Sequence, residues 1–282
     1  MADTTHHTGD TMTGGAPGDP AAFAQDTAVV LVWLALAALY LLAGRAAVLR
    51  GRTDWPLRRS VSWLAGTGLG LAVTVGPLER AAAGSLTAHM LVHLVLGMAV
   101  PLLLVLGAPV TLFLRAAPVR MGRRYSRLAS MRPLRLFADP VVAMLLTTAP
   151  MALLYWDGAA IALLHHAVLG PLLHVHFVAS GALFAYAVVG VDPNPHRSPA
   201  WVRAGTIVAA IAVHGIVAKH LYATAGGGAL PPDAEQAAQL MYYGGDAVHV
   251  LLLVVFCAQV YHEGGRRLRR PDVRGLATPR IV

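Results

Sequence analysis

The sequence predicts an all-α polytopic membrane protein, a bundle of seven transmembrane helices with its amino end outside the cytoplasm and its carboxyl end inside. Of its 282 residues, 56% are hydrophobic and only 13% are charged, and seven apolar stretches follow one another along the chain. An average soluble domain has about 25% charged residues. A membrane-spanning helix needs roughly 20 apolar residues, and each stretch comes near that length.

The apolar stretches define the expected helices in chain order. They cover residues 27–49, 59–75, 85–114, 139–156, 171–191, 201–222 and 239–261. Gly66 and Gly70 in the second helix have the small-xxx-small spacing of a packing face, within the bundle or in a homodimer. Pro101 and Pro109 in the third each free a carbonyl one turn earlier, so we expect a kink. An amphipathic stretch, 159–169, is expected at the membrane interface.

The two ends of the chain are expected to lie outside the bundle. Residues 1–26 are rich in Gly, Pro, Thr and Asp and contain no Lys or Arg, which predicts a disordered extracytoplasmic tail without the positive region of a signal peptide. Residues 27–262 form the expected transmembrane domain. Residues 263–282 form a basic cytoplasmic tail.

The basic residues predict the orientation. Twenty of the 22 Lys and Arg residues lie beside the connections after the first, third, fifth and seventh helices, including a basic loop around residues 115–135. Only Arg80 and Lys219 lie on the other side. By the positive-inside rule the basic side is cytoplasmic. The net charge of +8 therefore reports topology rather than nucleic-acid binding.

Eleven of the 13 histidines lie toward the outer side; His196 and His262 are cytoplasmic. Ionisable groups inside a membrane are costly and usually face the bundle interior. Imidazole suits Cu, Zn and Fe, and thioether favours Cu(I). Four helix-borne imidazoles exceed what packing needs, so we expect a buried metal site. The four are His89, His93, His214 and His249. The single Cys257 excludes a CxxC motif and an internal disulfide.

Further residues support this site. His89 and His93 are one turn apart and share a helix face, and Asp246 stands one turn before His249, where it would orient an imidazole. His174 and His176 are two residues apart on one expected helix, so we expect only one of the two side chains to face inward. The candidate set is His89, Met90, His93, His174, His176, His214, His220, Asp246 and His249.

Other residues have competing interpretations. His165 and His166 fit either interface anchoring or metal capture, and His6 and His7 fit a solvated tail. Met98 and Met144 are expected to fill the core. A lone membrane histidine is more often an interhelical hydrogen-bonding group than a ligand.

Ordered motifs carry a family resemblance. They are AHMLVH at 88–93 with PLLLVLGAP at 101–109, HVHFVASG at 174–181, VDPNP at 191–195 and YGGD at 243–246. Together they resemble the CtaG family of cytochrome c oxidase assembly factors, the multi-span type associated with caa3 oxidase. The motifs cover the third to seventh expected helices.

The resemblance implies a multi-pass protein of the bacterial plasma membrane that matures the oxidase by handling copper, and no enzymatic activity. The HMxxH element falls on His89, Met90 and His93; HxHF falls on His174, His176 and Phe177; GGD falls on Gly244, Gly245 and Asp246. Expected partners are oxidase subunits and the lipid bilayer, with a periplasmic copper chaperone and a second copy of the chain as further candidates.

Other functions remain open. A b-type haem could use His93 with His214 or His249 as axial ligands. A copper or proton conduit could use His and Asp at several depths. An intramembrane protease is disfavoured because Val178 occupies the place of the glycine expected before Ser180. A retinal protein is disfavoured because Lys219 is not on the seventh helix.

Overall fold

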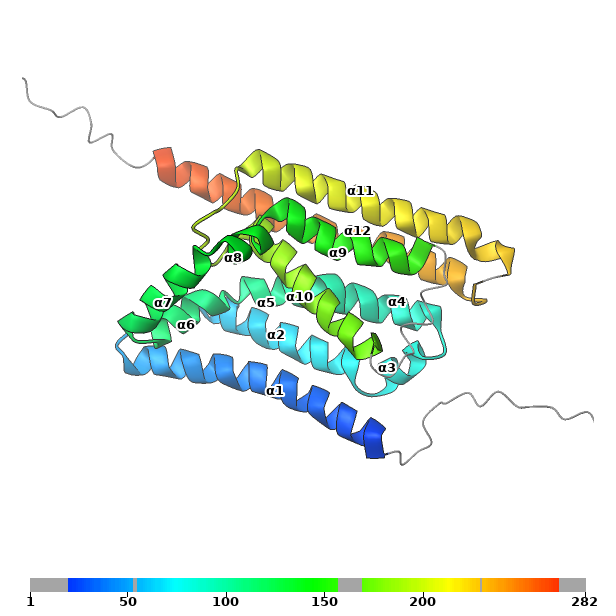
Figure 1. The fold of residues 1–282 in the computed structure, drawn as a ribbon, viewed down its shortest axis with the longest axis horizontal. Coiled ribbons are helices and arrows are strands. Elements are labelled where there is room, and N and C mark those ends of the chain that lie inside the picture. The colour runs from blue at the N-terminus through cyan, green and yellow to red at the C-terminus, as the bar shows by residue number, and fades with distance from the viewer. Residues whose placement is uncertain (1–19, 53–54, 157–168, 229, 269–282) are drawn as a thin grey trace, which may run out of the picture.

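The computed structural model describes residues 20–52, 55–156, 169–228 and 230–268. Within these ranges the chain forms helices and no strand, which confirms the all-α prediction. Figure 1 shows the long helices running side by side as one bundle, with α9, α11 and α12 along one side and α1 and α2 along the other.

The helices follow one another with short connections. In chain order they are α1 (Pro20–Leu49), α2 (Leu57–Thr74), α3 (Pro77–Ala82), α4 (Leu86–Leu94), the π-helix η1 (Val95–Ala99), α5 (Val100–Leu106), α6 (Pro109–Ala116), α7 (Val119–Ala129), α8 (Arg132–Phe137), α9 (Pro140–Trp156), α10 (Leu169–Val189), α11 (Ala200–Thr224), the 3-10 helix η3 (Ala225–Gly227) and α12 (Ala234–Leu268).

Five of these segments are long and apolar enough to cross a membrane, which is the pattern of a membrane protein. They are Phe23–Leu49, Leu86–Ala116, Leu169–Val189, Ala200–Gly227 and Ala234–Gly265. The two other expected spans are less clear-cut because α9 has 17 residues and α2 begins with two arginines among its 18. The count of seven spans stays a prediction.

Several expected boundaries are wrong. The first helix begins at Pro20, because proline suits a first helical turn and the following Ala-Ala-Phe-Ala continues it; residues 20–26 are therefore helix rather than tail. The last helix continues to Leu268. The basic loop is largely helical, because four arginines of α7 recur at helical spacing on one face. Residues 1–19, the 159–168 stretch with His165 and His166, and 269–282 lie outside the described residues.

The basic connections gather at one end of the bundle. In Figure 1, α7 and α8 lie at the same end as the α1–α2 connection and the carboxyl end of α12, whereas Pro20 lies at the opposite end. This arrangement agrees with the charge pattern, although the sidedness of the bundle in a membrane stays a prediction.

The glycine face of α2 packs inside the chain. A Cβ on Gly70 would lie 2.3 Å from the ring of Trp33 in α1, and one on Gly66 would lie 3.1 Å from the side chain of Leu104 in α5. These glycines therefore let α1 and α5 approach α2, and this face is not free for a second copy of the chain.

The third expected helix is interrupted near both prolines, as predicted. The π-helical turn η1 precedes Pro101, and Ala108 adopts φ 50° immediately before Pro109. The Tyr40 hydroxyl donates to the Gly107 carbonyl over 2.8 Å at this break. The break separates α5 from α6, whose first turn is capped from elsewhere.

That cap is Asp192 of the VDPNP motif. Its buried carboxylate accepts hydrogen bonds from the Val110 N–H at 3.1 Å, the Thr111 N–H at 2.7 Å and the Thr111 hydroxyl at 2.6 Å. Unpaired N–H groups at a helix start favour such a carboxylate. The α10–α11 connection is thereby fixed to α6.

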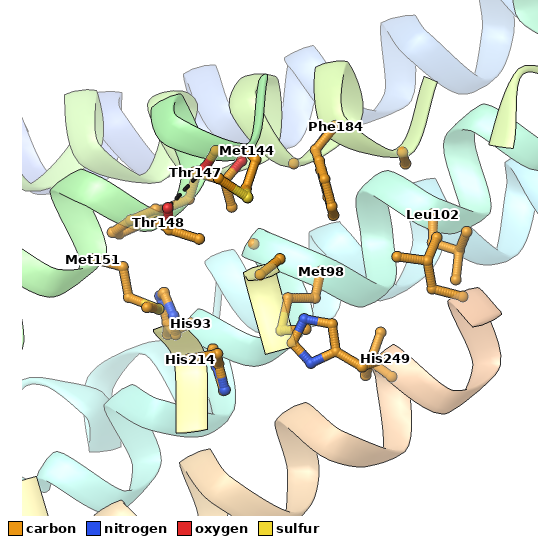
Figure 2. A pocket seen from close by; sticks show the side chains of 17 residues that line it. His93, Met98, Leu102, Met144, Thr147, Thr148, Met151, Phe184, His214 and His249 are labelled. Carbon is orange, nitrogen blue, oxygen red and sulfur yellow. Dashed lines mark hydrogen bonds between the residues drawn. The ribbon is translucent and has the colours of Figure 1, made fainter. Parts of the chain in front are cut away.

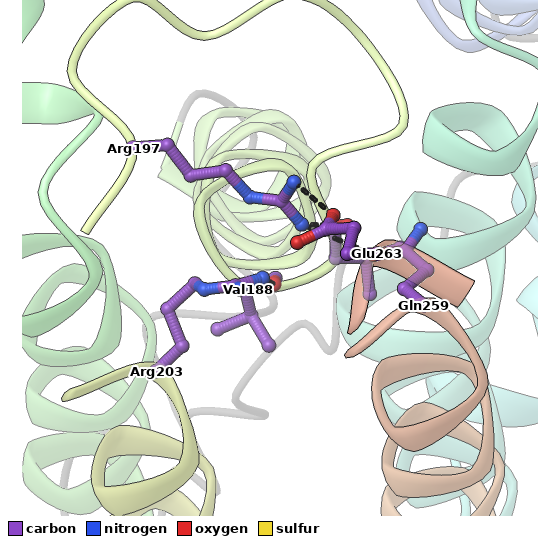
Figure 3. Close-up of polar contacts among 6 residues, drawn as sticks. Val188, Arg197, Arg203, Gln259 and Glu263 are labelled. Atoms are coloured by element: carbon purple, nitrogen blue, oxygen red, sulfur yellow. Dashed lines mark hydrogen bonds and ion pairs between the residues drawn. The ribbon is translucent and has the colours of Figure 1, made fainter. Parts of the chain in front are cut away.

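The same connection is tied to α12. Figure 3 shows the Arg197 guanidinium reaching Glu263, with which it forms an ion pair, and Gln259. The buried Arg203 donates to the Val188 carbonyl over 2.8 Å and lies over the Phe256 ring. Arginine bonded to backbone carbonyls at the basic end holds α10, α11 and α12 together there.

Candidate functional site

A cavity of about 50 Å³ lies in the interior of the bundle, enclosed by η1, α4, α5 and α9 to α12. That volume is room for a few water molecules or one ion. Figure 2 shows side chains from these helices pointing into the same space. The lining includes three histidines and three methionines: His93, Met98, Met144, Met151, His214 and His249.

The three histidines come from three different helices. His93 lies roughly 10 Å along α4 from its start, at about 1.5 Å per residue. His214 and His249 lie near the middle of the segments Ala200–Gly227 and Ala234–Gly265. All three side chains are buried, with at most 5% of their surface exposed. The structure therefore brings together three of the four expected imidazoles.

Some nitrogens of these imidazoles have no hydrogen-bond partner among the described residues. They are both nitrogens of His214 and the Nδ1 of His93. The His214 and His249 rings meet edge to face with centroids 5.3 Å apart. A buried polar group left unpaired costs about 1–3 kcal/mol. Nitrogens held in this state beside a cavity are available to a ligand that enters it.

The GGD element shapes the place of His214. A Cβ on Gly245 would lie 2.1 Å from Cε1 of His214, and one on Gly244 would lie 2.6 Å from the side chain of Leu94. Only glycine at 245 leaves room for that imidazole, which explains a motif that sequence alone did not connect with His214.

Close backbone packing forms the opposite wall. A Cβ on Gly181 would lie 2.2 Å from the Gly97 carbonyl oxygen in η1. Pro101 cannot donate to that carbonyl, because it lacks an N–H, and the π-helical turn lies just before it. Such turns are frequent at functional sites. Here the turn carries Met98, which lines the cavity.

His89 lies beside the cavity rather than in its lining. Its Nε2 is 2.8 Å from the Tyr155 hydroxyl, and the same tyrosine ring meets His93 edge-on with centroids 5.3 Å apart. The two histidines share a helix face, as predicted from their spacing, and both contact Tyr155, but only His93 lines the cavity. Binding of one ion by both stays a prediction.

His176 satisfies a carbonyl that a proline has freed. Its Nε2 lies 3.0 Å from the Leu146 carbonyl oxygen of α9. The residue four positions after Leu146 is Pro150, inside the helix, which cannot donate to that oxygen. The imidazole therefore replaces the missing backbone hydrogen bond.

His220 satisfies a helix end. Its Nε2 lies 2.9 Å from the carbonyl oxygen of Trp156, the last residue of α9, and its ring stacks on the Trp156 indole with centroids 4.0 Å apart. Carbonyls at a helix carboxyl end lack intrahelical donors. This arrangement gives His220 a structural role at the end of the bundle opposite α7 and α8 (Figure 1).

The remaining candidates lie outside the cavity lining. Met90 is fully buried in an apolar cluster with Tyr155 and Met241. His174 on α10 and Asp246 on α12 are half-buried. Phe177 of the HxHF element does line the cavity and contacts the ring of His93 edge-on.

The donor set differs from the expected one. Among the described residues, no group of three or more His, Cys, Asp or Glu side chains is placed to hold a metal ion. The cavity instead adds Met98, Met144 and Met151 to its histidines. The signal was present in the sequence, since Met144 and Met151 are seven residues apart and so share a face of α9.

Comparison with known proteins shows which family this chain resembles. The family model of the cytochrome c oxidase caa3 assembly factor, Caa3_CtaG, matches residues 38–263. An uncharacterized protein of Mycobacterium bovis is 33% identical over 180 residues, and one of Mycobacterium leprae is 29% identical over 179. Each alignment covers 61% of this chain and 27% of the relative, so the chain spans about a quarter of these proteins. No solved structure shows significant similarity to the chain.

Proposed function

The chain belongs to the family of cytochrome c oxidase caa3 assembly factors, and we propose that it holds copper in the buried cavity and delivers it to an oxidase subunit in the bacterial plasma membrane. The observation that carries this proposal is that His93, His214 and His249, from three different helices, line one small cavity, and that His93 and His214 carry buried nitrogens without a hydrogen-bond partner in the described residues. Copper is the cargo in this proposal, and no chemical transformation by the chain is needed.

The chemistry of the site supports copper. Neutral imidazole is a good copper ligand, and an ion bound there would satisfy nitrogens that have no partner in the described chain. Tyr155, bonded to His89, would hold the wall behind His93. Asp246, one turn from His249, would orient that ring, and His174 would help to capture the ion from the outer side.

The proposed exchange partners follow from this placement. An oxidase subunit within the membrane would receive the ion, and a periplasmic copper chaperone would supply it. A haem is less well supported, because a cavity of about 50 Å³ would have to open by separation of the helices to hold a porphyrin.

The test is a Cu(I) titration of the purified full-length protein under anaerobic conditions against a competing chelator. We expect bound copper in the wild type, little in a variant with His93, His214 and His249 all changed to Ala, and wild-type binding by His220→Ala, the matched control. A Soret band in the purified protein would support haem instead.

The cellular counterpart is oxidase activity in a strain lacking the chromosomal copy. We expect the wild type and His220→Ala to restore activity, and the triple variant to fail unless copper is added to the medium. Full copper binding and full oxidase activity in the triple variant would overturn the proposal.

A further inference from the structure

We propose that Met98, Met144 and Met151 are ligands, so that the cavity is a mixed thioether–imidazole site selective for Cu(I) over divalent ions. This inference rests on the proposed copper function and specifies its ligands. Sequence reasoning assigned Met98 and Met144 to the core, but all three side chains line the cavity together with the three histidines (Figure 2).

Two elements place the thioethers. Met144 and Met151 lie two turns apart on one face of α9, whereas Met98 lies in η1. A π-helical turn holds more residues than an α-helical one and so shifts the face on which its residues lie. The result is that sulfur reaches the cavity from both α9 and η1.

Simple packing explains these methionines less well. Methionine usually fills irregular gaps because its chain is flexible. Here a gap of about 50 Å³ remains beside three methionines, and unpartnered imidazole nitrogens border it. Met90 and Met151 belong to the same buried apolar cluster, but only Met151 lines the cavity.

The charge of the cavity lining favours a monovalent ion over a divalent ion. The residues around the cavity include no Asp, Glu or Cys, so every available donor is neutral. Even with the Asp246 carboxylate near His249, a divalent ion held by neutral ligands would keep a net positive charge inside the bundle, where burial of uncompensated charge is very costly. A monovalent ion with neutral thioether and imidazole ligands keeps a single charge. Thioether ligands also favour Cu(I).

The experiment compares methionine-to-leucine variants by anaerobic Cu(I) titration against a chelator, with Ag(I) as a redox-inert second probe and Zn(II) as the divalent comparison. We expect the triple variant of Met98, Met144 and Met151 to lose Cu(I) and Ag(I) affinity by at least about 100-fold, beyond the typical effect of an outer-shell partner. Met90→Leu should stay within about threefold, because this exchange conserves core volume.

A second readout does not depend on the stability of the triple variant. Copper X-ray absorption of the loaded wild type should show sulfur scattering, which each single variant should reduce. Wild-type Cu(I) affinity in the triple variant, or a spectrum with nitrogen and oxygen scattering only, would overturn the thioether assignment while copper binding itself stands. Binding of Zn(II) as tight as Cu(I) would overturn the selectivity. Absence of any copper binding by the wild type would overturn both proposals.

Discussion

Two groups of histidines in the described part of the chain differ in how their nitrogens are satisfied. Outside the cavity, His89 contacts a tyrosine hydroxyl, His176 contacts a carbonyl freed by a proline, and His220 contacts the last carbonyl of a helix. In the central cavity, His214 has no hydrogen-bond partner for either nitrogen within the described residues. The residue type is the same, but of these two groups only the central one has unpaired nitrogens and lines a cavity.

The difference shows that the hydrogen-bond partners of a buried histidine in a membrane bundle indicate whether it stabilises the bundle or can bind a ligand. An imidazole that satisfies an otherwise unpaired carbonyl contributes to the stability of the bundle. An imidazole whose nitrogens lack partners in the protein weakens the empty bundle and is compensated when an ion binds. Variants of the two groups should therefore separate stability from copper binding.

The largest expected effect is that of Gly245→Ala. The new methyl group would lie 2.1 Å from the His214 ring, so the imidazole must move. We expect a loss of about 1–3 kcal/mol in unfolding free energy, and a fall in Cu(I) affinity of roughly 10–100-fold, as for a ligand that has lost its orientation. Thermal unfolding in detergent and Cu(I) titration would measure the two effects.

Gly215→Ala is the matched control for Gly245→Ala. It adds the same methyl group next to His214 in sequence, but its Cβ would make ordinary contact with Tyr242 at 3.6 Å. Copper affinity close to wild type is expected. Equal losses in both variants would mean that the glycine effect is unrelated to the position of the imidazole.

The next-largest expected effect, that of His176→Leu, is on the stability of the bundle and not on its copper affinity. His176→Leu leaves the Leu146 carbonyl without its donor and should lower the unfolding free energy by about 1 kcal/mol, with Cu(I) affinity unchanged. Pro150→Ala supplies a backbone N–H to that same carbonyl, so His176→Leu should cost less than half as much in this background. A double-mutant cycle measures this coupling. Independent, additive effects would refute the carbonyl role of His176.

The sequence predicted the helical class, the order of the helices and the helix-borne histidines, because apolar length and the 3.6-residue period are local properties. It did not predict which histidines meet. His89 and His93 share a face and both contact Tyr155 of α9, yet only His93 lines the cavity, and that packing is a tertiary property. Met98 and Met144 were predicted to fill the core because a thioether in an apolar stretch looks the same whether or not a cavity lies beside it.

A smaller stability effect is expected for His220→Ala. The ring is half-buried at the end of the bundle, where water can replace its hydrogen bond to the Trp156 carbonyl. We expect a loss of about 0.5 kcal/mol, in the low range for hydrogen bonds, and no change in copper affinity. A tenfold loss of Cu(I) affinity would move His220 from the group outside the cavity to the site.

The smallest expected effect is a loss of stability at low pH through Asp233, which joins two helix starts away from the cavity. Partial burial would raise the pKa of Asp233, but hydrogen bonds from Ser85 and Thr87 outweigh it and lower the pKa below its ordinary value of 3.8. The carboxylate joins the start of α4 to the start of α12, accepting from the Ser85 hydroxyl at 2.7 Å and the Thr87 N–H at 2.8 Å. Because the pKa is lowered in the folded state, this stabilisation is present above pH 3.8 and is lost as the pH falls through the folded-state pKa.

Asp233→Asn should therefore lower the melting temperature slightly at pH 7 and reduce the further loss that the wild type shows below pH 4. Cu(I) affinity at pH 7 should be unchanged, because Asp233 joins two helix starts and does not line the cavity. If the substitution weakened copper binding as much as it weakened the fold, these helix starts and the cavity would be one cooperative unit. The division between structural and ligand-binding histidines would then not hold.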